Sequence, residues 1–234
     1  MWTRRELKQN AKEVLKRTYW LSFAVVLVGE LIANVGSTYK IVSNYSKIFG
    51  NELPTTVIFS GTAFTLLFMI FLALPLLAGK CYFFMRSRQY DTEFTDMFSG
   101  FTNGNYLHTI GTLLLKQIFI FLWSLLLFIP GIIKTYEYYF VPYIIMENPQ
   151  ISRKRAFELS RQMTNGFKWN IFVLELSFIG WSLLGLLLCG IGILFVAPYI
   201  EATKAELYAA QRAHVLQEGV TDEAELCGFS KNIF

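Results

Sequence analysis

The sequence predicts an all-α fold: a polytopic transmembrane helical bundle with six spans as three hairpins, plus amphipathic interfacial helices. Two observations predict it. Of the 234 residues, 54% are hydrophobic and only 16% are charged, whereas soluble domains carry about 25% charged residues. In addition, one threading of the chain through a membrane places most of the 21 Lys and Arg residues on a single side. By the positive-inside rule that side is the cytoplasm, so both termini are predicted to be cytoplasmic.

The first part of the chain is predicted to contain a surface helix and two spans. Residues 1–17 form a cytoplasmic amphipathic helix, because apolar residues recur at near-helical spacing between basic ones. The first span, about 18–35, has no cleavage site and stays as a signal anchor. A polar loop at 36–56 lies outside. The second span, about 57–79, has no charge and contains Pro75, which neighbouring helices can accommodate in a membrane.

The middle of the chain is predicted to cross the membrane twice. A cytoplasmic stretch at 80–105 forms a short surface helix and a loop. Span three, about 106–129, stops at Pro130-Gly131, because this dipeptide ends a helix and turns the chain. The return span, 132–146, would be only about 22 Å long as a helix. Whether this segment crosses the whole bilayer stays open.

A second basic surface helix is predicted at 152–165, with Ser152 as its N-cap. Its apolar residues Ala156, Leu159 and Met163 share one face.

The last apolar run, 169–200, would be about 48 Å long as one helix, against a hydrocarbon core of about 30 Å. It is therefore divided at Gly190 and Gly192 into spans of about 169–188 and 191–210. The six spans together make a membrane domain at 18–210. The cytoplasmic tail, 211–234, follows.

A four-span topology is the alternative. It leaves 132–146 outside and takes 169–200 as one tilted helix. That choice moves a group of cations to the external face: Arg153, Lys154, Arg155, Arg161 and Lys168. The charge rule therefore favours six spans. Their rhythm suggests a triplication, although the three units do not align by residue identity.

Ionisable residues at membrane depth are the candidate functional residues, because an unpaired charge at the bilayer centre costs about 2.5 to 3.5 kcal/mol. They are Glu30, Lys116, Lys134, Glu137 and Glu175. Counting along the helices places Lys116 and Glu175 at depths that allow them to pair. Glu30, Lys134 and Glu137 fall in the outer half, where Lys134 and Glu137 share a helix face. Either these groups fix helix register as paired charges, or they line a polar path through the bundle.

No motif of a soluble enzyme is present, and no catalytic, cofactor-binding or metal-binding residue is expected. His108 and His214 have no Cys, Asp or Glu at ligand spacing. The three cysteines, Cys81, Cys189 and Cys227, are isolated and indicate no disulfide framework. The basic residues lie where apolar runs end, as anionic lipid selects, so nucleic acid is not expected as a partner.

One long motif resembles a known family. It comprises Pro130-Gly131-Ile132-Ile133-Lys134-x-Tyr136-x-Tyr138, Tyr143-Ile144-x-x-Glu147-Asn148-Pro149-x-Ile151-Ser152, Ala156-x-x-x-Ser160-x-x-Met163-x-x-Gly166-x-Lys168, Leu176-Ser177-Phe178-Ile179-Gly180-Trp181, Gly190-Ile191-Gly192 and Pro198-Tyr199. The pattern resembles domain-of-unknown-function family 975. This resemblance implies a bacterial integral membrane protein and transfers no activity, cofactor, substrate or site residue.

The sequence thus favours a non-enzymatic component of the inner membrane that binds lipid or a partner protein. The alternative is a transporter or channel for ions or small solutes, with a polar path through the bundle. Membrane lipid is the expected partner, and a second copy of the chain or another membrane protein is a further one. A water-filled cavity reaching the middle of the membrane would discriminate the two functions, because a scaffold does not need it.

Overall fold

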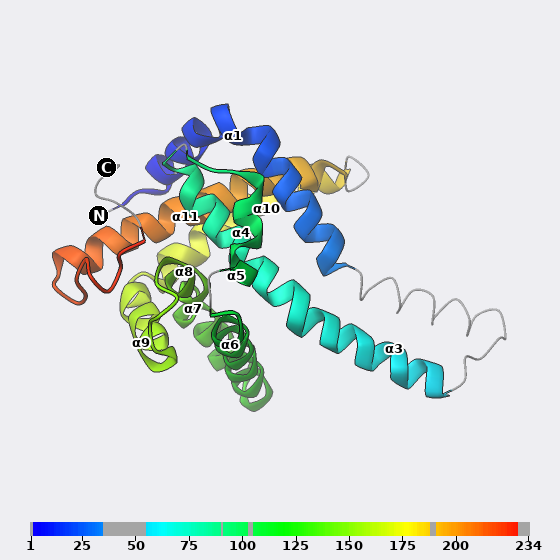
Figure 1. Cartoon of the computed structure of the whole chain (residues 1–234). Helices are drawn as coiled ribbons and strands as arrows, with labels where there is room; N and C mark the ends of the chain where they lie inside the picture. The colour runs from blue at the N-terminus through cyan, green and yellow to red at the C-terminus, as the bar shows by residue number, and fades with distance from the viewer. Residues whose placement is uncertain (1, 35–54, 90, 103–104, 188–190, 229–234) are drawn as a thin grey trace.

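The computed structural model describes residues 2–34, 55–89, 91–102, 105–187 and 191–228 (Figure 1). These residues form helices joined by turns, and no strand occurs among them, so the predicted all-α class is confirmed for the described chain. The predicted outer loop at 36–56 lies almost entirely outside the described residues, as do Cys189 and the expected reversal at Gly190.

The first helix, α1 (Arg4–Ala33), is continuous where the sequence predicts a surface helix to residue 17 and a separate span from 18. Thr3 caps it, since its hydroxyl accepts from the Glu6 amide and the Glu6 carboxylate accepts from the Thr3 amide. The buried residues of α1 follow one helical face through the expected junction: Leu7, Ala11, Val14, Leu15, Thr18, Ser22, Val25 and Val26. Because one packing face runs through the junction, nothing there breaks the helix.

The second apolar segment forms α3 (Thr55–Phe68), the π-helical turn η1 (Met69–Ala73) and α4 (Leu74–Ser87) without interruption. Pro75 lies in the first turn of α4, directly after η1. A proline donates no backbone hydrogen bond, and a π-helical turn is one way in which a helix absorbs that loss. The predicted end at residue 79 is too early, because α4 continues into the stretch expected to leave the membrane.

The segment after α4 packs closely against it. The 3₁₀ helix η2 (Phe94–Phe98) and the short α5 (Ser99–Thr102) follow. A Cβ atom at Gly79 would overlap the carbonyl oxygen of Met97. Arg86 holds the turn by binding Asp91 and Asp96, each at 2.7 Å. The stretch predicted as a short helix and a loop is therefore a packed helical turn.

The helix α6 (Tyr106–Leu126) ends three residues before the predicted 129, since Leu127 is extended and α7 (Phe128–Glu137) begins at once. The expectation that Pro130-Gly131 stops the span is wrong. Pro130 lies in the first turn of α7, where its missing amide costs no hydrogen bond. At Gly131 a Cβ would lie 2.7 Å from the Cα of Ser124, so glycine lets α7 approach α6.

The predicted span 132–146 is not one helix. It comprises the second half of α7 and the seven-residue α8 (Val141–Glu147), separated by a turn at 138–140. At 1.5 Å per residue α7 is about 15 Å long, half of a 30 Å hydrocarbon core. All seven residues of α8 are buried inside the protein, six apolar or aromatic side chains and the carboxylate of Glu147.

The last three helices are α9 (Arg153–Thr164), α10 (Lys168–Leu187) and α11 (Ile191–Gln217). The predicted helix at 152–165 is confirmed: Ser152 accepts from the Arg155 amide, and Ala156, Leu159 and Met163 are fully buried. Gly185 of α10 and Gly192 of α11 touch, with Cα of Gly185 2.7 Å from a Cβ built at Gly192. By contrast α11 extends past the predicted end of span six at 210.

Three stretches of the described chain are long and apolar enough to cross a membrane: Gly61–Ser87, Tyr106–Leu126 and Lys168–Leu187. They correspond to predicted spans two, three and five. The other three predicted spans do not meet this standard, since α1 and α11 carry charged residues and 132–146 is broken. Length and composition thus support membrane crossing for half of the predicted spans.

Figure 1 shows α3 and the α6–α7 pair extending away from a packed body. We call that body, formed by α1, α4, α8, α9 and α11, the base. We call the apolar parts of α3–η1, α6–α7 and α10 the projecting ends; they comprise residues 61–72, 118–133 and 176–187. Most of the exposed large apolar side chains lie on these ends, among them Phe64, Leu125, Phe128 and Leu187.

Candidate functional site

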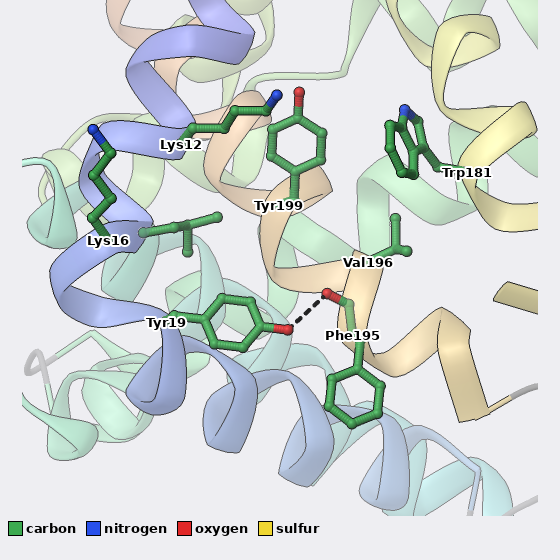
Figure 2. Close-up of a pocket in the computed structure, with 8 residues that line it drawn as sticks. Lys12, Lys16, Tyr19, Trp181, Phe195, Val196 and Tyr199 are labelled. Atoms are coloured by element: carbon green, nitrogen blue, oxygen red, sulfur yellow. Dashed lines mark hydrogen bonds between the residues drawn. The ribbon is translucent and has the colours of Figure 1, made fainter. Parts of the chain in front are cut away.

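A pocket with a volume of about 500 Å³ lies between α1, α10 and α11 (Figure 2). Its lining comes from α1 (Lys12, Leu15, Lys16 and Tyr19), α10 (Trp181) and α11 (Phe195, Val196 and Tyr199). We call it the lysine–aromatic pocket. Its volume falls within the range of about 300 to 1,000 Å³ that small-molecule sites occupy.

The cations of this pocket come from the helical spacing of α1. Lys8, Lys12 and Lys16 follow one another at four-residue intervals and therefore share a face. Lys8 is engaged, because its ammonium donates to the Ser177 hydroxyl at 2.7 Å and lies 4.4 Å from the centre of the Phe178 ring. Lys12 and Lys16 continue the row into the pocket.

The electrostatics of the pocket are positive. Lys12 extends toward Tyr199, with its ammonium 5.7 Å from the ring centre (Figure 2). Lys16 has an exposed ion pair with Glu13 at 3.4 Å, and such surface pairs contribute about 0 to 1 kcal/mol. No acidic side chain is among the lining residues. The two ammonium groups are therefore available to an anion.

The remaining wall is aromatic and apolar. The Tyr19 hydroxyl donates to the carbonyl oxygen of Phe195 at 3.1 Å, which joins α1 to α11. Phe23 stacks on Phe195 with ring centres 5.0 Å apart. Trp20 and Trp181 are both more than half exposed beside this wall. Aromatic side chains of this kind are enriched where a membrane meets water.

The predicted pair of Lys116 and Glu175 does not form. Glu175 instead accepts a hydrogen bond from the Tyr136 hydroxyl at 2.9 Å. Lys116 is half-buried on α6 and makes no ion pair with any carboxylate in the described part of the chain. Equal depth along two helices did not bring the two side chains together, because α7 lies between the end of α6 and α10.

The structure joins Lys134 and Glu137, whose Nζ and Oε2 atoms lie 2.5 Å apart. Glu137 also binds Lys168 at 2.7 Å and approaches Arg161 at 3.7 Å. Arg161 and Lys168 belong to the cations that the charge rule places in the cytoplasm. The structure thus brings Glu137, at the end of α7, together with cations of α9 and α10, whereas its depth in the membrane stays a prediction.

Glu30 is exposed near the end of α1, at a cavity of about 100 Å³ that Lys80 of α4 also lines. A Cβ built at the neighbouring Gly29 would lie within 4 Å of Met97 of η2 and Lys80 of α4. The depth of Glu30 in the membrane stays a prediction.

A buried ion cluster escaped the sequence analysis. Glu201 of α11 binds Lys80 at 3.3 Å and Lys204 at 3.2 Å, and all three side chains are largely shielded. Nearby on α11, Glu206 binds Arg88 at 2.7 Å. The available signal was three charged residues inside predicted span 191–210, namely Glu201, Lys204 and Glu206. They indicate that this part of α11 packs against other charges.

A second buried cluster attaches the C-terminal segment to the base. Glu147 accepts hydrogen bonds from Arg212, at 2.7 Å, and from the Tyr208 hydroxyl. Arg155 binds both carboxylate oxygens of Glu225, at 2.7 and 2.8 Å. This bond lowers the pKa of Glu225 below its ordinary value. The segment predicted as a tail is thus anchored at least as far as residue 228.

Metal chemistry has no visible basis in residues 2–228 as far as they are described, since no group of three His, Cys, Asp or Glu side chains could hold an ion. Cys81 is buried and Cys227 is exposed, and both are free thiols.

Residues 125–214 match the family described as "Protein of unknown function (DUF975)". The match runs from the end of α6 through most of α11 and confirms the resemblance seen in the sequence. No curated protein and no solved structure matches the chain.

Proposed function

We propose that this chain, whose residues 125–214 match the DUF975 family, is a non-enzymatic, multi-pass component of the cytoplasmic membrane that binds membrane lipid. One observation carries the proposal. Most of the large exposed apolar side chains lie on the projecting ends, whereas the buried ion pairs of Glu201 with Lys80 and of Glu147 with Arg212 belong to the base. Hydrocarbon is the solvent in which such a surface is stable.

In this proposal the three helix pairs enter the membrane as hairpins: α1 with α3, α6 with α7, and α10 with α11. Both termini and the basic α9 then lie in the cytoplasm, in agreement with the positive-inside rule. This topology is the six-span arrangement that the charge pattern favours. Since α7 alone is about 15 Å long, the second hairpin needs α8 or a thinned bilayer to complete a crossing.

The topology is tested with Lys154→Cys in a variant whose Cys81, Cys189 and Cys227 are replaced by serine. Lys154 is 88% exposed on α9, so the new thiol should react readily. A membrane-impermeant maleimide should label it in inside-out vesicles and not in right-side-out vesicles. Labelling from the outside would overturn the orientation.

Lipid binding is tested by purifying the full chain in native-lipid particles and identifying what remains after detergent exchange. A defined lipid retained in a fixed ratio to protein supports the proposal. Recovery of a folded chain free of lipid contradicts it, and recovery of a second protein in fixed ratio points to the partner-binding role instead.

A transporter is the second candidate, favoured by the buried cluster of Lys80, Glu201 and Lys204 and by the small cavity beside Glu30 and Lys80. Transport would require this polar region to open to both sides of the membrane. The cavity holds only about 100 Å³. Ion flux into proteoliposomes that Glu201→Gln abolishes, while the variant stays folded, would favour this role over lipid binding.

A further inference from the structure

The lysine–aromatic pocket has two chemically different ends. Lys12 and Lys16 supply two ammonium groups on one face of α1, while Trp181, Phe195 and Val196 supply an apolar floor from α10 and α11 (Figure 2). No carboxylate lines it to cancel the positive charge. A small inorganic anion would leave the aromatic floor unused, and an uncharged lipid would leave the ammonium groups unused.

The pocket also lies at a boundary. On one side α10 continues into a projecting end with exposed Leu183, Leu184 and Leu187. On the other side α1 carries exposed basic residues toward its N-terminus. The exposed indoles of Trp20 and Trp181 mark the level between them, as aromatic residues do at a membrane surface. Lipid phosphates occupy the same level.

We propose that the lysine–aromatic pocket binds one anionic phospholipid, with the phosphate between Lys12 and Lys16 and the start of an acyl chain along Phe195 and Trp181. This inference rests on the proposed lipid-binding function and specifies its site and its lipid class. Charge complementarity selects the headgroup, because each cation near an anionic surface contributes about 1 kcal/mol. The aromatic wall selects a lipid over a soluble anion.

Tryptophan quenching by brominated lipid tests the site. The full chain is placed in phosphatidylcholine nanodiscs, and brominated phosphatidylglycerol or brominated phosphatidylcholine is added. We expect saturable quenching by phosphatidylglycerol at low mole fraction, and Trp181→Phe should remove most of that saturable component. Phosphatidylcholine should quench only in proportion to its mole fraction.

The double variant Lys12→Gln, Lys16→Gln should weaken phosphatidylglycerol binding by about 30-fold, as two such cations predict. The matched control is Arg4→Gln, Arg5→Gln, which removes the same charge from the same helix at exposed positions outside the pocket. It should change binding by about twofold or less. All four residues are exposed, so folding should be retained, as circular dichroism would verify.

Two results would overturn the inference. Equal weakening by both double variants means that general surface charge attracts the lipid. Full competition by millimolar inorganic phosphate means that the pocket takes a soluble anion. In either case, lipid retained in native particles would still support the proposed lipid-binding function. A chain that retains no lipid would contradict both that function and the phospholipid site at the lysine–aromatic pocket.

Discussion

The base and the projecting ends of this chain differ in what they bury and expose. The base buries ion pairs, whereas the ends expose large apolar side chains. In the base Glu147 is only 3% exposed and is bound by Arg212 and Tyr208. In the projecting ends Phe128 is 77% exposed. An exposed apolar surface of this kind marks contact with a membrane or a partner protein. In the proposed function hydrocarbon surrounds the ends and water surrounds the base.

The comparison predicts its largest effect at the buried charges of the base. Glu147→Ala removes the carboxylate that Arg212 and Tyr208 bind, and breaking a buried pair costs about 3 to 5 kcal/mol. Denaturant unfolding in detergent micelles measures the loss. Glu158→Ala is the control, since its pair with Lys154 is exposed and 3.9 Å long, and should cost under about 0.5 kcal/mol. Similar losses of unfolding free energy for the two variants would contradict the burial of the Glu147 ion pair in the base.

The next effect is expected at the tip of the α6–α7 pair. Phe128→Asp puts a charge on a surface assigned to hydrocarbon, where insertion scales give a penalty of about 2.5 to 3.5 kcal/mol. The fraction of chain resistant to carbonate extraction should fall sharply, while Phe128→Leu should behave as the original. If the aspartate variant integrates normally, the tip does not lie deep in the membrane.

Close backbone packing should matter at Gly79 in the base and not at Gly180 in a projecting end. At Gly79 a methyl group would overlap the carbonyl oxygen of Met97, so Gly79→Ala should cost about 2 to 3 kcal/mol, the upper part of the overpacking range. Gly180, on α10, has no atom within 4 Å of an added Cβ. Gly180→Ala should leave the unfolding free energy within about 0.5 kcal/mol. If Gly180→Ala costs more than Gly79→Ala, the close contact does not lie between α4 and η2.

The smallest effect concerns pH and the C-terminal segment. Because Arg155 lowers the pKa of Glu225 from its ordinary 4.5, the bond stabilises the folded segment fully above pH 4.5 and loses this effect as the pH falls through the folded pKa. The contribution is about 1 kcal/mol. An acid-tolerant protease should cleave the original chain within residues 218–228 more readily at low pH. The Glu225→Gln variant should be cleaved equally at pH 4 and pH 6. Unchanged cleavage of the original chain would exclude this anchor.

The sequence by itself determined the all-α class, the helix at 152–165 with its cap at Ser152, and three stretches suited to a membrane. These properties depend on neighbours within a few turns, which hydropathy and periodicity report directly. The same reasoning could have predicted that α1 is one continuous helix, since its buried face runs through residue 17 at regular helical spacing.

Only the tertiary structure decided which charges meet. Glu137 pairs with Arg161 and Lys168, Glu201 with Lys80, and Lys8 reaches Ser177, across sequence separations of up to 169 residues. Depth counting assumed straight, parallel helices of full length. The break between α7 and α8 and the crossing of α1 over α11 invalidated that assumption. The lysine–aromatic pocket depends on the same crossing, because α1 must pack against the distant α10 and α11 before the charged and apolar walls of the pocket exist.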